Sequence, residues 1–159
     1  MRDVTITLVA AGELRETLRA IVGEIAYAES GKPYAVDGAL QFNVSHSGDY
    51  ALIATTPRAP IGVDIERHRD RDWRRLAARF FAPDEASLLQ SADDFYRLWV
   101  IKEAVLKAIG TGIWGGLATV VYANGIATTP HGTFEVELLD APPGYSAAVA
   151  IWTAGLRPA

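Results

Sequence analysis

Three carboxylates in this sequence could act together, although two of them lie far from the third along the chain. Asp64 and Glu66 stand in the segment GVDIE, and Glu103 stands in the segment WVIKEAVLKAIGTG. If GVDIE is a strand, Asp64 and Glu66 share one face, with their Cα atoms about 7 Å apart. Oxygen ligands without Cys or His clusters suit Mg²⁺, which binds one or two carboxylates together with substrate phosphates. The pattern allows either a Mg²⁺ site or a charged strand edge that faces water.

The segment around Glu103 is very apolar for one that carries three charged side chains. Most residues from Leu98 to Ile109 are apolar, and a helix of that composition is usually buried. On a helical wheel Lys102, Glu103 and Lys107 fall within about 140° of arc, with Glu103 in the middle. Burying a charge is costly unless it is paired or bound. One interpretation is a Glu103–Lys107 pair worth roughly 0.2–0.5 kcal/mol, and the other is a bound cation that faces Glu103.

Two further segments, NVSHSGD and SGKPY, could contact an anion. Small hydroxyls, a histidine and a glycine at a strand end are typical of an anion-binding turn, with backbone N–H groups, Ser45, His46 and Ser47 as donors. The same residues also suit an ordinary hairpin connection. A Ser-His nucleophile is disfavoured, because adjacent strand residues point apart and the sequence lacks a nucleophile elbow. Gly31 and Pro33 predict a turn that could place Lys32 near a phosphate or a ring.

The composition is that of an ordinary globular protein. The chain has 159 residues, 50% of them apolar and 21% charged, which suits a single domain over residues 1–159. It has no cysteine, so we expect neither a disulfide framework nor a cysteine-ligated metal. The net charge of −4 argues against nucleic acid as the main partner. We find no signal-peptide pattern and no apolar run of membrane-spanning length, so the expected location is the cytoplasm.

The elements that must position these residues are a mixture of strands and helices. Alternating and β-branched runs predict strands at residues 4–9, 40–45, 50–56 and 61–66. Helical spacing predicts an amphipathic helix over residues 13–25 and a long helix from about Asp93 to Ile109. Two short helices precede the long one, the first ending near Phe81 and the second opening at APDE. Later strands are expected in LATVVY, GIATT, GTFEVELL and YSAAVAIW, so the fold class is α+β.

The sequence resembles the 4′-phosphopantetheinyl transferase superfamily, in particular its Sfp-like type, through five segments in the same order: GKPY, FNVSHSGDYALIA, GVDIE, RFFAPDEASLL and LWVIKEAVLKAIGTGI. The resemblance covers about residues 27–152. It implies two similar α/β halves packed as a pseudo-dimer, here about residues 1–66 and 67–159. The basic stretch usual before the first helix is missing, so we expect a shortened first half in which Arg15 and Arg19 are the nearest bases.

The resemblance also implies a reaction. Such enzymes transfer the phosphopantetheine arm of coenzyme A to a serine of an acyl, peptidyl or polyketide carrier protein and release adenosine 3′,5′-bisphosphate. Asp64, Glu66 and Glu103 match the Mg²⁺ ligands that hold the pyrophosphate of coenzyme A. Glu103 is also the candidate base for the carrier serine, and Lys107 matches a lysine that stabilises charge on the phosphates. Phosphoryl transfer depends mainly on positioning and charge neutralisation, which these residue types supply.

Residues that contact coenzyme A are implied in the same way: Gly31, Lys32 and Pro33 near the adenine, Ser45 and His46 at a phosphate, and Lys102 and Lys107 beside the anion. Two alternatives stay open. The chain could be a degenerate member that binds coenzyme A or a carrier protein without transfer. It could instead be another Mg²⁺-dependent phosphate enzyme, such as a nucleotide pyrophosphohydrolase, although that leaves GKPY and NVSHSGD unexplained. No membrane or nucleic acid partner is expected.

Overall fold

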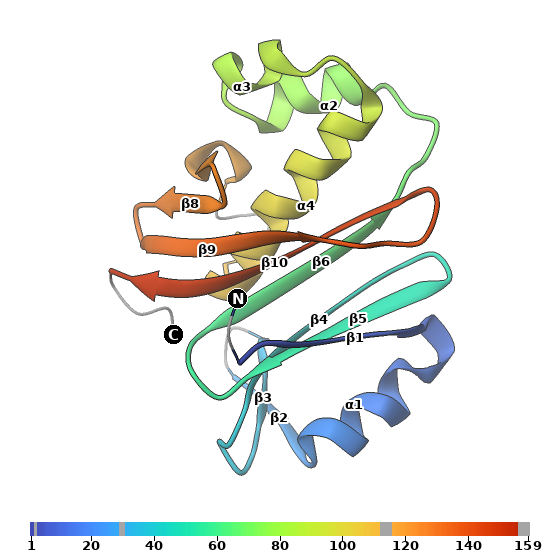
Figure 1. Cartoon of the computed structure of the whole chain (residues 1–159), viewed down its shortest axis with the longest axis vertical. Helices are drawn as coiled ribbons and strands as arrows, with labels where there is room; N and C mark the ends of the chain where they lie inside the picture. Colours follow the sequence, from blue (N-terminus) through green and yellow to red (C-terminus); the bar gives the residue numbers. More distant parts are fainter. Residues whose placement is uncertain (2, 29–30, 112–115, 156–159) are drawn as a thin grey trace.

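Helix α4 (Ala92–Ile109) lies across one face of a five-stranded sheet, and helix α1 (Leu14–Val22) packs on a three-stranded sheet (Figure 1). The computed structural model describes residues 1, 3–28, 31–111 and 116–155. Helices α2 (Trp73–Phe80) and α3 (Pro83–Leu88) stand at one end of the molecule, and α1 stands at the other. The expected α+β fold class is confirmed.

The smaller sheet is antiparallel, in the order β1 (Thr5–Ala10), β5 (Tyr50–Thr56), β4 (Gln41–Ser47). A 3₁₀ turn, η1 (Ala11–Glu13), leads from β1 into α1. Leu18 and Val22 of α1 are buried against Phe42 and Ile53 of this sheet. A short hairpin, β2 (Ile25–Tyr27) with β3 (Pro33–Ala35), closes the same end of the molecule. The apolar stripe predicted for the first helix therefore faces this sheet.

The larger sheet is also antiparallel and contains the GVDIE segment as its edge strand. Its order is β6 (Ile61–Arg67), β10 (Tyr145–Ala154), β9 (Gly132–Leu139), β8 (Ile126–Thr129), β7 (Val121–Ala123), and η3 (Leu117–Thr119) precedes β7. Ile61, Val63 and Ile65 of β6 are buried with Leu52 and Ala54 of β5 in a core that joins the two sheets. The opposite face of β6, which carries Asp64, is therefore turned toward α4.

Local sequence explains where α4 begins and ends. The Ser91 hydroxyl accepts a hydrogen bond from the Asp94 amide at 3.1 Å, and the Asp94 carboxylate accepts one from the Ser91 amide at 3.0 Å. This reciprocal capping box pairs amides that the first turn would otherwise leave unbonded. Gly110 ends the helix in a left-handed conformation with φ of 91°, which favours glycine.

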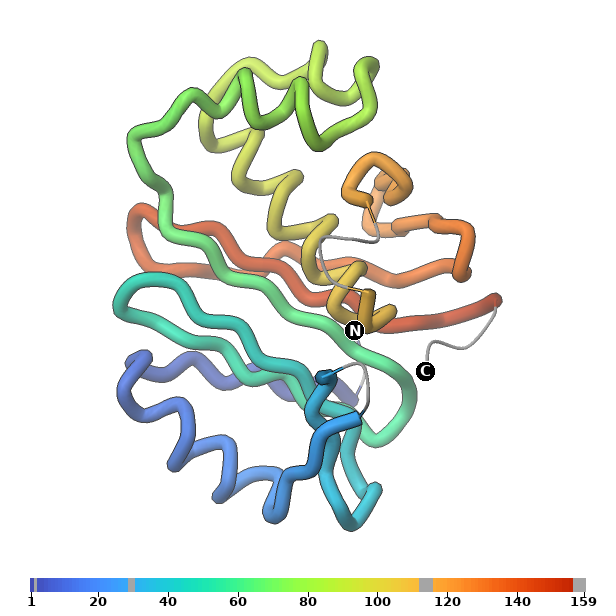
Figure 2. Tube along the Cα trace, turned by 180° about the vertical axis from the view of Figure 1, so that it is seen from behind, coloured from blue at the N-terminus to red at the C-terminus, as the bar shows by residue number. Residues whose placement is uncertain are grey.

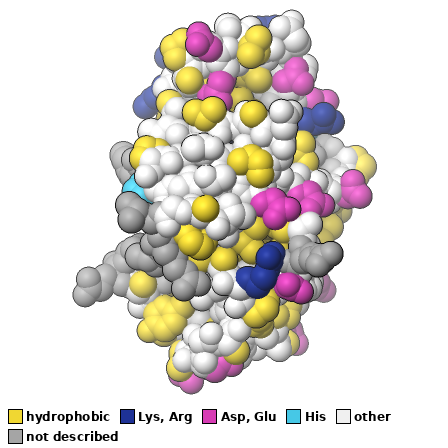
Figure 3. Space-filling model, turned by 60° about the vertical axis from the view of Figure 1, so that its left-hand side comes forward, with side chains coloured by type: hydrophobic (Ala, Val, Ile, Leu, Met, Phe, Trp, Pro, Cys, Tyr) yellow, Lys and Arg dark blue, Asp and Glu magenta, His cyan; other side chains and the backbone are white. Residues whose placement is uncertain are grey.

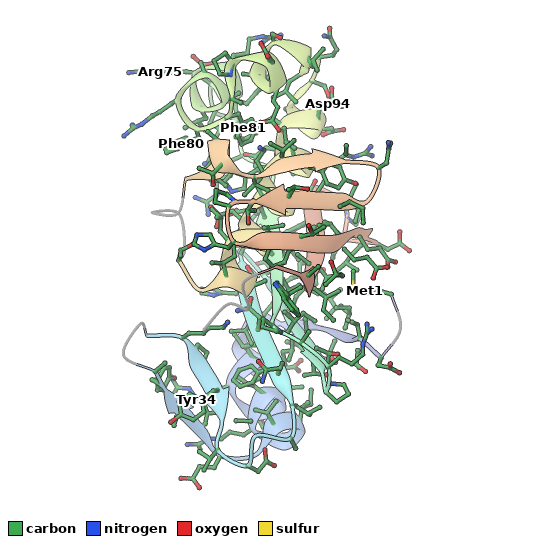
Figure 4. The ribbon with its side chains drawn as sticks, turned by 90° about the vertical axis from the view of Figure 1, so that its left-hand side faces the viewer. Met1, Tyr34, Arg75, Phe80, Phe81 and Asp94 are labelled. Carbon is green, nitrogen blue, oxygen red and sulfur yellow. The ribbon has the colours of Figure 1, made fainter. Side chains whose placement is uncertain are left out.

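An aromatic cluster attaches the end of α2 to the first half of α4. Phe95 packs against Phe81 and Trp99 with ring centroids 5.5 Å away in each case, and Phe80 meets Trp99 edge-on at 5.6 Å. Phe80 and Phe81 lie on the side of α2 that faces the five-stranded sheet, whereas Arg75 extends away from it (Figure 4). The cluster therefore holds the part of α4 that precedes Glu103.

The closest approach between α4 and β6 requires a glycine. A Cβ at Gly62 would lie 2.0 Å from the carbonyl oxygen of Ala104 and 2.4 Å from the amide nitrogen of Ala108. Both are backbone atoms, so any side chain at Gly62 would force the helix away from the strand. Seen from behind, α4 runs directly over β6 and β10 (Figure 2). Because Gly62 has no side chain, α4 packs close enough to β6 for its Lys107 to contact Asp64.

Several expected elements differ in their ends. The helix expected over residues 13–25 ends at Val22, because Gly23 adopts a positive φ of 71° and Ile25 enters β2. The segment expected to be one strand, LATVVY, begins as the 3₁₀ turn η3. The turn expected at residues 30–34 runs into β3, with residue 30 outside the described residues. The division into halves near residue 66 stays a prediction.

The surface carries charges of both signs. On the face shown in Figure 3, acidic and basic side chains lie among hydrophobic ones. None of the described helices combines the length and the apolar composition needed to cross a membrane.

Candidate active site

Where β4 runs beside β6, the amides of β6 donate hydrogen bonds to side chains of β4 and not to its backbone. Every second residue of β4 here is small and polar, and each accepts a hydrogen bond from a β6 amide. The donor and acceptor pairs are Val63 N with Asn43 Oδ1 (3.1 Å), Ile65 N with Ser45 Oγ (3.3 Å) and Arg67 N with Ser47 Oγ (3.1 Å). These bonds join the two sheets and turn the β4 hydroxyls toward the carboxylates of β6.

Asp64 lies at the centre of a buried charged group. Its Oδ1 accepts hydrogen bonds from Ser45 Oγ at 2.9 Å and from Lys107 Nζ at 2.6 Å. Lys107 also donates to Ser45 Oγ at 2.8 Å. The side chain of Asp64 is only 5% exposed, and its Oδ2 is buried with no hydrogen-bond partner. The structure therefore brings Ser45, Asp64 and Lys107 together and leaves one carboxylate oxygen unused.

The other two carboxylates face the same space. Glu66 accepts a hydrogen bond from Ser47 Oγ at 3.0 Å, and Glu103 Oε1 is buried without a partner. Burial, followed by the charge of Asp64, raises the pKa of Glu103 to about 7. The same two causes raise the pKa of Glu66. Like charges thus accumulate here beyond what Lys107 neutralises.

A single cavity of about 300 Å³ connects these groups, a size within the range of small-molecule sites. It is lined by Val44, Ser45, His46, Asp64, Glu66, Trp99, Glu103 and Lys107. His46 is exposed at the rim on β4, whereas Asp64 and Glu103 are buried. Six of the ten residues expected at the site therefore line one cavity.

The fit of this cavity to Mg²⁺ can be judged from the atoms present. As the side chains stand, the described part of the chain has no group of three or more His, Asp or Glu that could hold a metal ion. Two buried carboxylate oxygens, one of Asp64 and one of Glu103, nevertheless lack partners, and burial raises the pKa of Glu103. A hard dication is the kind of group that such oxygens bind. The donor set fits Mg²⁺ in its chemistry, and the ligand roles stay a prediction.

The GKP turn lies beside the C-terminal end of α4. Lys32 Nζ donates a hydrogen bond to the carbonyl oxygen of Ala108 at 3.1 Å, and burial lowers the pKa of Lys32. Lys32 and Pro33 line a second cavity of about 330 Å³ together with Phe42 of β4, and Gly31 precedes them in the turn. Strand β4 contributes residues to both cavities, so the turn lies near the charged group although the two cavities share no residue.

The prediction that Lys102 contacts coenzyme A is wrong for this structure. Lys102 is fully buried and faces away from the cavity. Its ammonium donates to both carboxylate oxygens of Glu85 at 2.9 and 2.7 Å and to the carbonyl oxygens of Leu117 and Val120. These acceptors satisfy the charge inside the protein, and burial lowers the pKa of Lys102. Lys102 therefore joins α3 and η3 to α4.

The sequence interpretation missed two contributors, Asn43 and Trp99. Asn43 shares the alternation of Ser45 and Ser47 along β4, and small polar residues at every second strand position signal a face that bonds to something polar. Trp99 lines the cavity while its ring packs on Phe95. A helical wheel places Trp99 one turn before Glu103, which is the signal that could have found it.

Comparison with known proteins gives a consistent result. The family model of the 4′-phosphopantetheinyl transferase superfamily matches residues 60–154, from β6 through α4 to β10. The chain therefore belongs to the 4′-phosphopantetheinyl transferase superfamily. HetI of Nostoc sp., named as a 4′-phosphopantetheinyl transferase, is 44% identical over 98 residues, which are 55% of this chain and 41% of HetI.

Two further relatives carry the same name. The gsp protein of Aneurinibacillus migulanus is 40% identical over 92 residues, covering 54% of this chain and 38% of the relative. AcpT of Salmonella typhimurium is 39% identical over 99 residues, covering 57% of this chain and 52% of AcpT. The chain thus spans about half the length, or less, of the curated relatives it matches.

Proposed function

We propose that this chain transfers the 4′-phosphopantetheine arm of coenzyme A to a serine of an acyl, peptidyl or polyketide carrier protein. In this reaction the serine Oγ forms a bond to the phosphorus that carries the pantetheine arm. The bond from that phosphorus to the bridging pyrophosphate oxygen breaks, and adenosine 3′,5′-bisphosphate leaves. The observation that carries the proposal is one cavity containing Asp64, Glu66, Glu103 and Lys107 in a member of this superfamily.

Lys107 is suited to neutralise the transferring phosphates. An ammonium has three N–H donors, and among the described residues Lys107 gives hydrogen bonds to Ser45 and Asp64. It lines the cavity with its side chain 26% exposed, so an incoming phosphate oxygen can accept from it. A charge-assisted bond of that kind stabilises developing negative charge in the transition state.

The three carboxylates would hold Mg²⁺, which supplies charge neutralisation and orientation of the pyrophosphate when it is bound. Asp64 and Glu103 offer the buried oxygens without partners, and Glu66 offers the oxygen that Ser47 does not bind. The hydroxyls of Ser45 and Ser47 fix Asp64 and Glu66 before any ligand arrives. Preorganised ligands of this kind lower the cost of binding.

Glu103 is the candidate base for the carrier serine, directly or through a water molecule. Burial raises its pKa to about 7 in the metal-free protein, and Mg²⁺ bound beside it would lower that pKa, so Glu103 would be ionised and able to accept the serine proton. When the serine oxygen attacks the phosphorus, the serine proton passes to Glu103. His46 at the rim and Lys32, Pro33 and Gly31 at the second cavity are the proposed contacts for the rest of coenzyme A. Both substrates would be met in the cytoplasm.

The experiment is to incubate the protein with coenzyme A, Mg²⁺ and an apo carrier protein, and to separate the nucleotides by chromatography. We expect adenosine 3′,5′-bisphosphate to accumulate only when the carrier is present. A carrier whose acceptor serine is replaced by alanine is the matched control. Cleavage of coenzyme A without a carrier would favour a pyrophosphohydrolase, and binding without cleavage would favour the degenerate binding module.

A further inference from the structure

The three carboxylates and the lysine of the site come from two elements, so their geometry depends on how far α4 is shifted along β6. Asp64 and Glu66 come from β6, whereas Glu103 and Lys107 come from α4. Tyr96 precedes Glu103 by seven residues, which is two helical turns, so Tyr96 lies on the same stripe of α4. A contact at Tyr96 can therefore set the position of Glu103 along the strand.

At one end of the contact between α4 and β6, the backbone of α4 lies close against Gly62. The other end is set by His68, the first residue after β6. The His68 ring stacks on the Tyr96 ring, with centroids 4.4 Å apart and planes 13° apart. Next to it, the Tyr96 hydroxyl accepts from the Arg69 amide at 2.9 Å and lies 3.3 Å from the Arg69 carbonyl oxygen. Asp64 and Glu66 lie between the two ends.

His68 is held by three further contacts. Its Nε2 lies 2.8 Å from Ser146 Oγ, its Nδ1 lies 3.4 Å from Asp93 Oδ1, and its amide donates to the carbonyl oxygen of Gly144 at 2.7 Å. Ser146 is the residue of β10 directly opposite Glu66, so the two share a face of the sheet. Ser146 is only 8% exposed, and its hydroxyl lies within hydrogen-bond distance of His68.

We propose that His68 is a positioning residue that sets the register of α4 against β6 and so brings Glu103 and Lys107 to Asp64 and Glu66. This inference rests on the proposed function only for its consequence in catalysis. The group formed by His68, Tyr96, Ser146 and Asp93 is called the His68 clamp below. Loss of the clamp leaves both elements folded and lets the far end of the contact shift, so ligand binding between them weakens.

The test uses two variants that each remove one partner of the hydrogen bond between His68 and Ser146. His68→Phe keeps a ring on Tyr96 and removes the bonds to Ser146 and Asp93, whereas Ser146→Ala removes only the hydroxyl. The double variant closes a double-mutant cycle. His131→Phe is the matched control, because His131 is exposed in the turn between β8 and β9.

The first readout is amide hydrogen exchange at Arg67 and His68, compared with amides in the middle of β10. We expect about tenfold faster exchange at these two amides in His68→Phe and in Ser146→Ala, with no further change in the double variant. We expect no change in His131→Phe. Unchanged exchange at Arg67 and His68 overturns the clamp, whether or not the wild-type protein transfers phosphopantetheine.

The second readout is Mn²⁺ affinity in the presence of coenzyme A, measured by electron paramagnetic resonance at a temperature where every variant is folded. We expect about tenfold weaker Mn²⁺ binding in both single variants and in the double variant. A lower melting temperature with unchanged Mn²⁺ affinity would mean a merely structural role and would overturn the positioning role. Absence of both Mn²⁺ binding and transfer in the wild type would count against the proposed function, and the exchange comparison would still decide the clamp.

Discussion

The ammonium of Lys107 lies 2.6 Å from Oδ1 of Asp64, which makes a largely buried ion pair between helix α4 and strand β6. Ser45 completes the group by bonding to both partners. Because Asp64 is nearly inaccessible, pairing with Lys107 compensates the burial of its carboxylate when no other cation is bound. The pair therefore has two roles that mutation can separate, one in stability and one in the charge offered to a phosphate.

Replacing Lys107 by methionine should impair both roles. Removing one partner of a buried pair leaves an unpaired charge, and the partial exposure of Lys107 reduces the cost to about 1–3 kcal/mol of unfolding free energy. Transfer should fall at least about tenfold at matched concentrations of folded protein. Urea unfolding without metal and a transfer assay give the two values. In the double variant Asp64→Asn, Lys107→Met, stability should largely recover while transfer should not. Normal transfer by Lys107→Met would leave this lysine with a structural role alone.

Glu103 should make the metal-free protein less stable as the pH rises. The folded state holds its pKa at about 7, above the ordinary value of 4.5, so the folded protein binds the proton more tightly than the unfolded chain. The stabilising effect of that proton is complete below about pH 4.5 and is lost as the pH rises toward about 7. The loss is of the order of a few kcal/mol.

Unfolding in urea at pH 5 and pH 8 with EDTA measures this effect. Glu103→Gln has no proton to lose, so its stability should change much less between the two pH values. Adding Mg²⁺ and coenzyme A at pH 8 should stabilise the wild type, because a ligand that binds only the folded state shifts the equilibrium. The variant should gain little. Equal pH dependence in both proteins would contradict the burial assigned to Glu103.

Gly62→Ala should displace α4 from β6. The added Cβ would meet backbone atoms of Ala104 and Ala108 at 2.0 and 2.4 Å, and backbone cannot rotate away as a side chain does. We expect a loss of about 1–3 kcal/mol in stability and a fall in transfer that is larger than this loss explains. Gly12→Ala is the matched control, because nothing lies within 4 Å of a Cβ at Gly12. Similar melting curves for the two variants would count against the close approach.

Lys102→Met should destabilise the fold without changing how the folded protein binds coenzyme A. It would leave Glu85 and two carbonyl oxygens without their shared donor, a loss of roughly 3 kcal/mol or more. The ammonium lies outside the cavity, so coenzyme A affinity should stay within about twofold by calorimetry below the melting temperature. A much weaker affinity in the folded variant would restore Lys102 to the binding site.

Much of the fold could be predicted from periodicity and capping. The strand expected at residues 61–66 is β6, GTFEVELL is β9, and the helix expected from about Asp93 is α4, which begins one residue earlier. These segments are strongly patterned, and α4 is bounded by Ser91 and Gly110, so local and tertiary preferences agree. The first helix is shorter than expected because apolar spacing continues through Gly23 into a strand. Spacing alone does not distinguish a helix end from a change of element.

The site could be predicted less completely. Asp64, Glu66, Glu103 and Lys107 were expected together and line one cavity. Lys102 was expected in the binding site but lies outside the cavity. Because most of the surface of α4 is buried, the position of a residue on the helical wheel does not show whether its charge faces the cavity or another part of the interior. Its partner Glu85 lies 17 residues earlier on α3, and only the packing of α3 on α4 brings them together. The His68 clamp likewise joins residues from three separate segments, which sequence spacing does not reveal.

The intact mass of an apo carrier protein tests the central claim most directly. The carrier is incubated with this chain, coenzyme A and Mg²⁺, and parallel samples contain EDTA or the Glu103→Gln variant. We predict that the carrier gains the mass of one phosphopantetheine group with the wild-type chain, and that both parallel samples stay at the apo mass. An unchanged carrier mass, with a folded chain that binds coenzyme A, would contradict the transferase account.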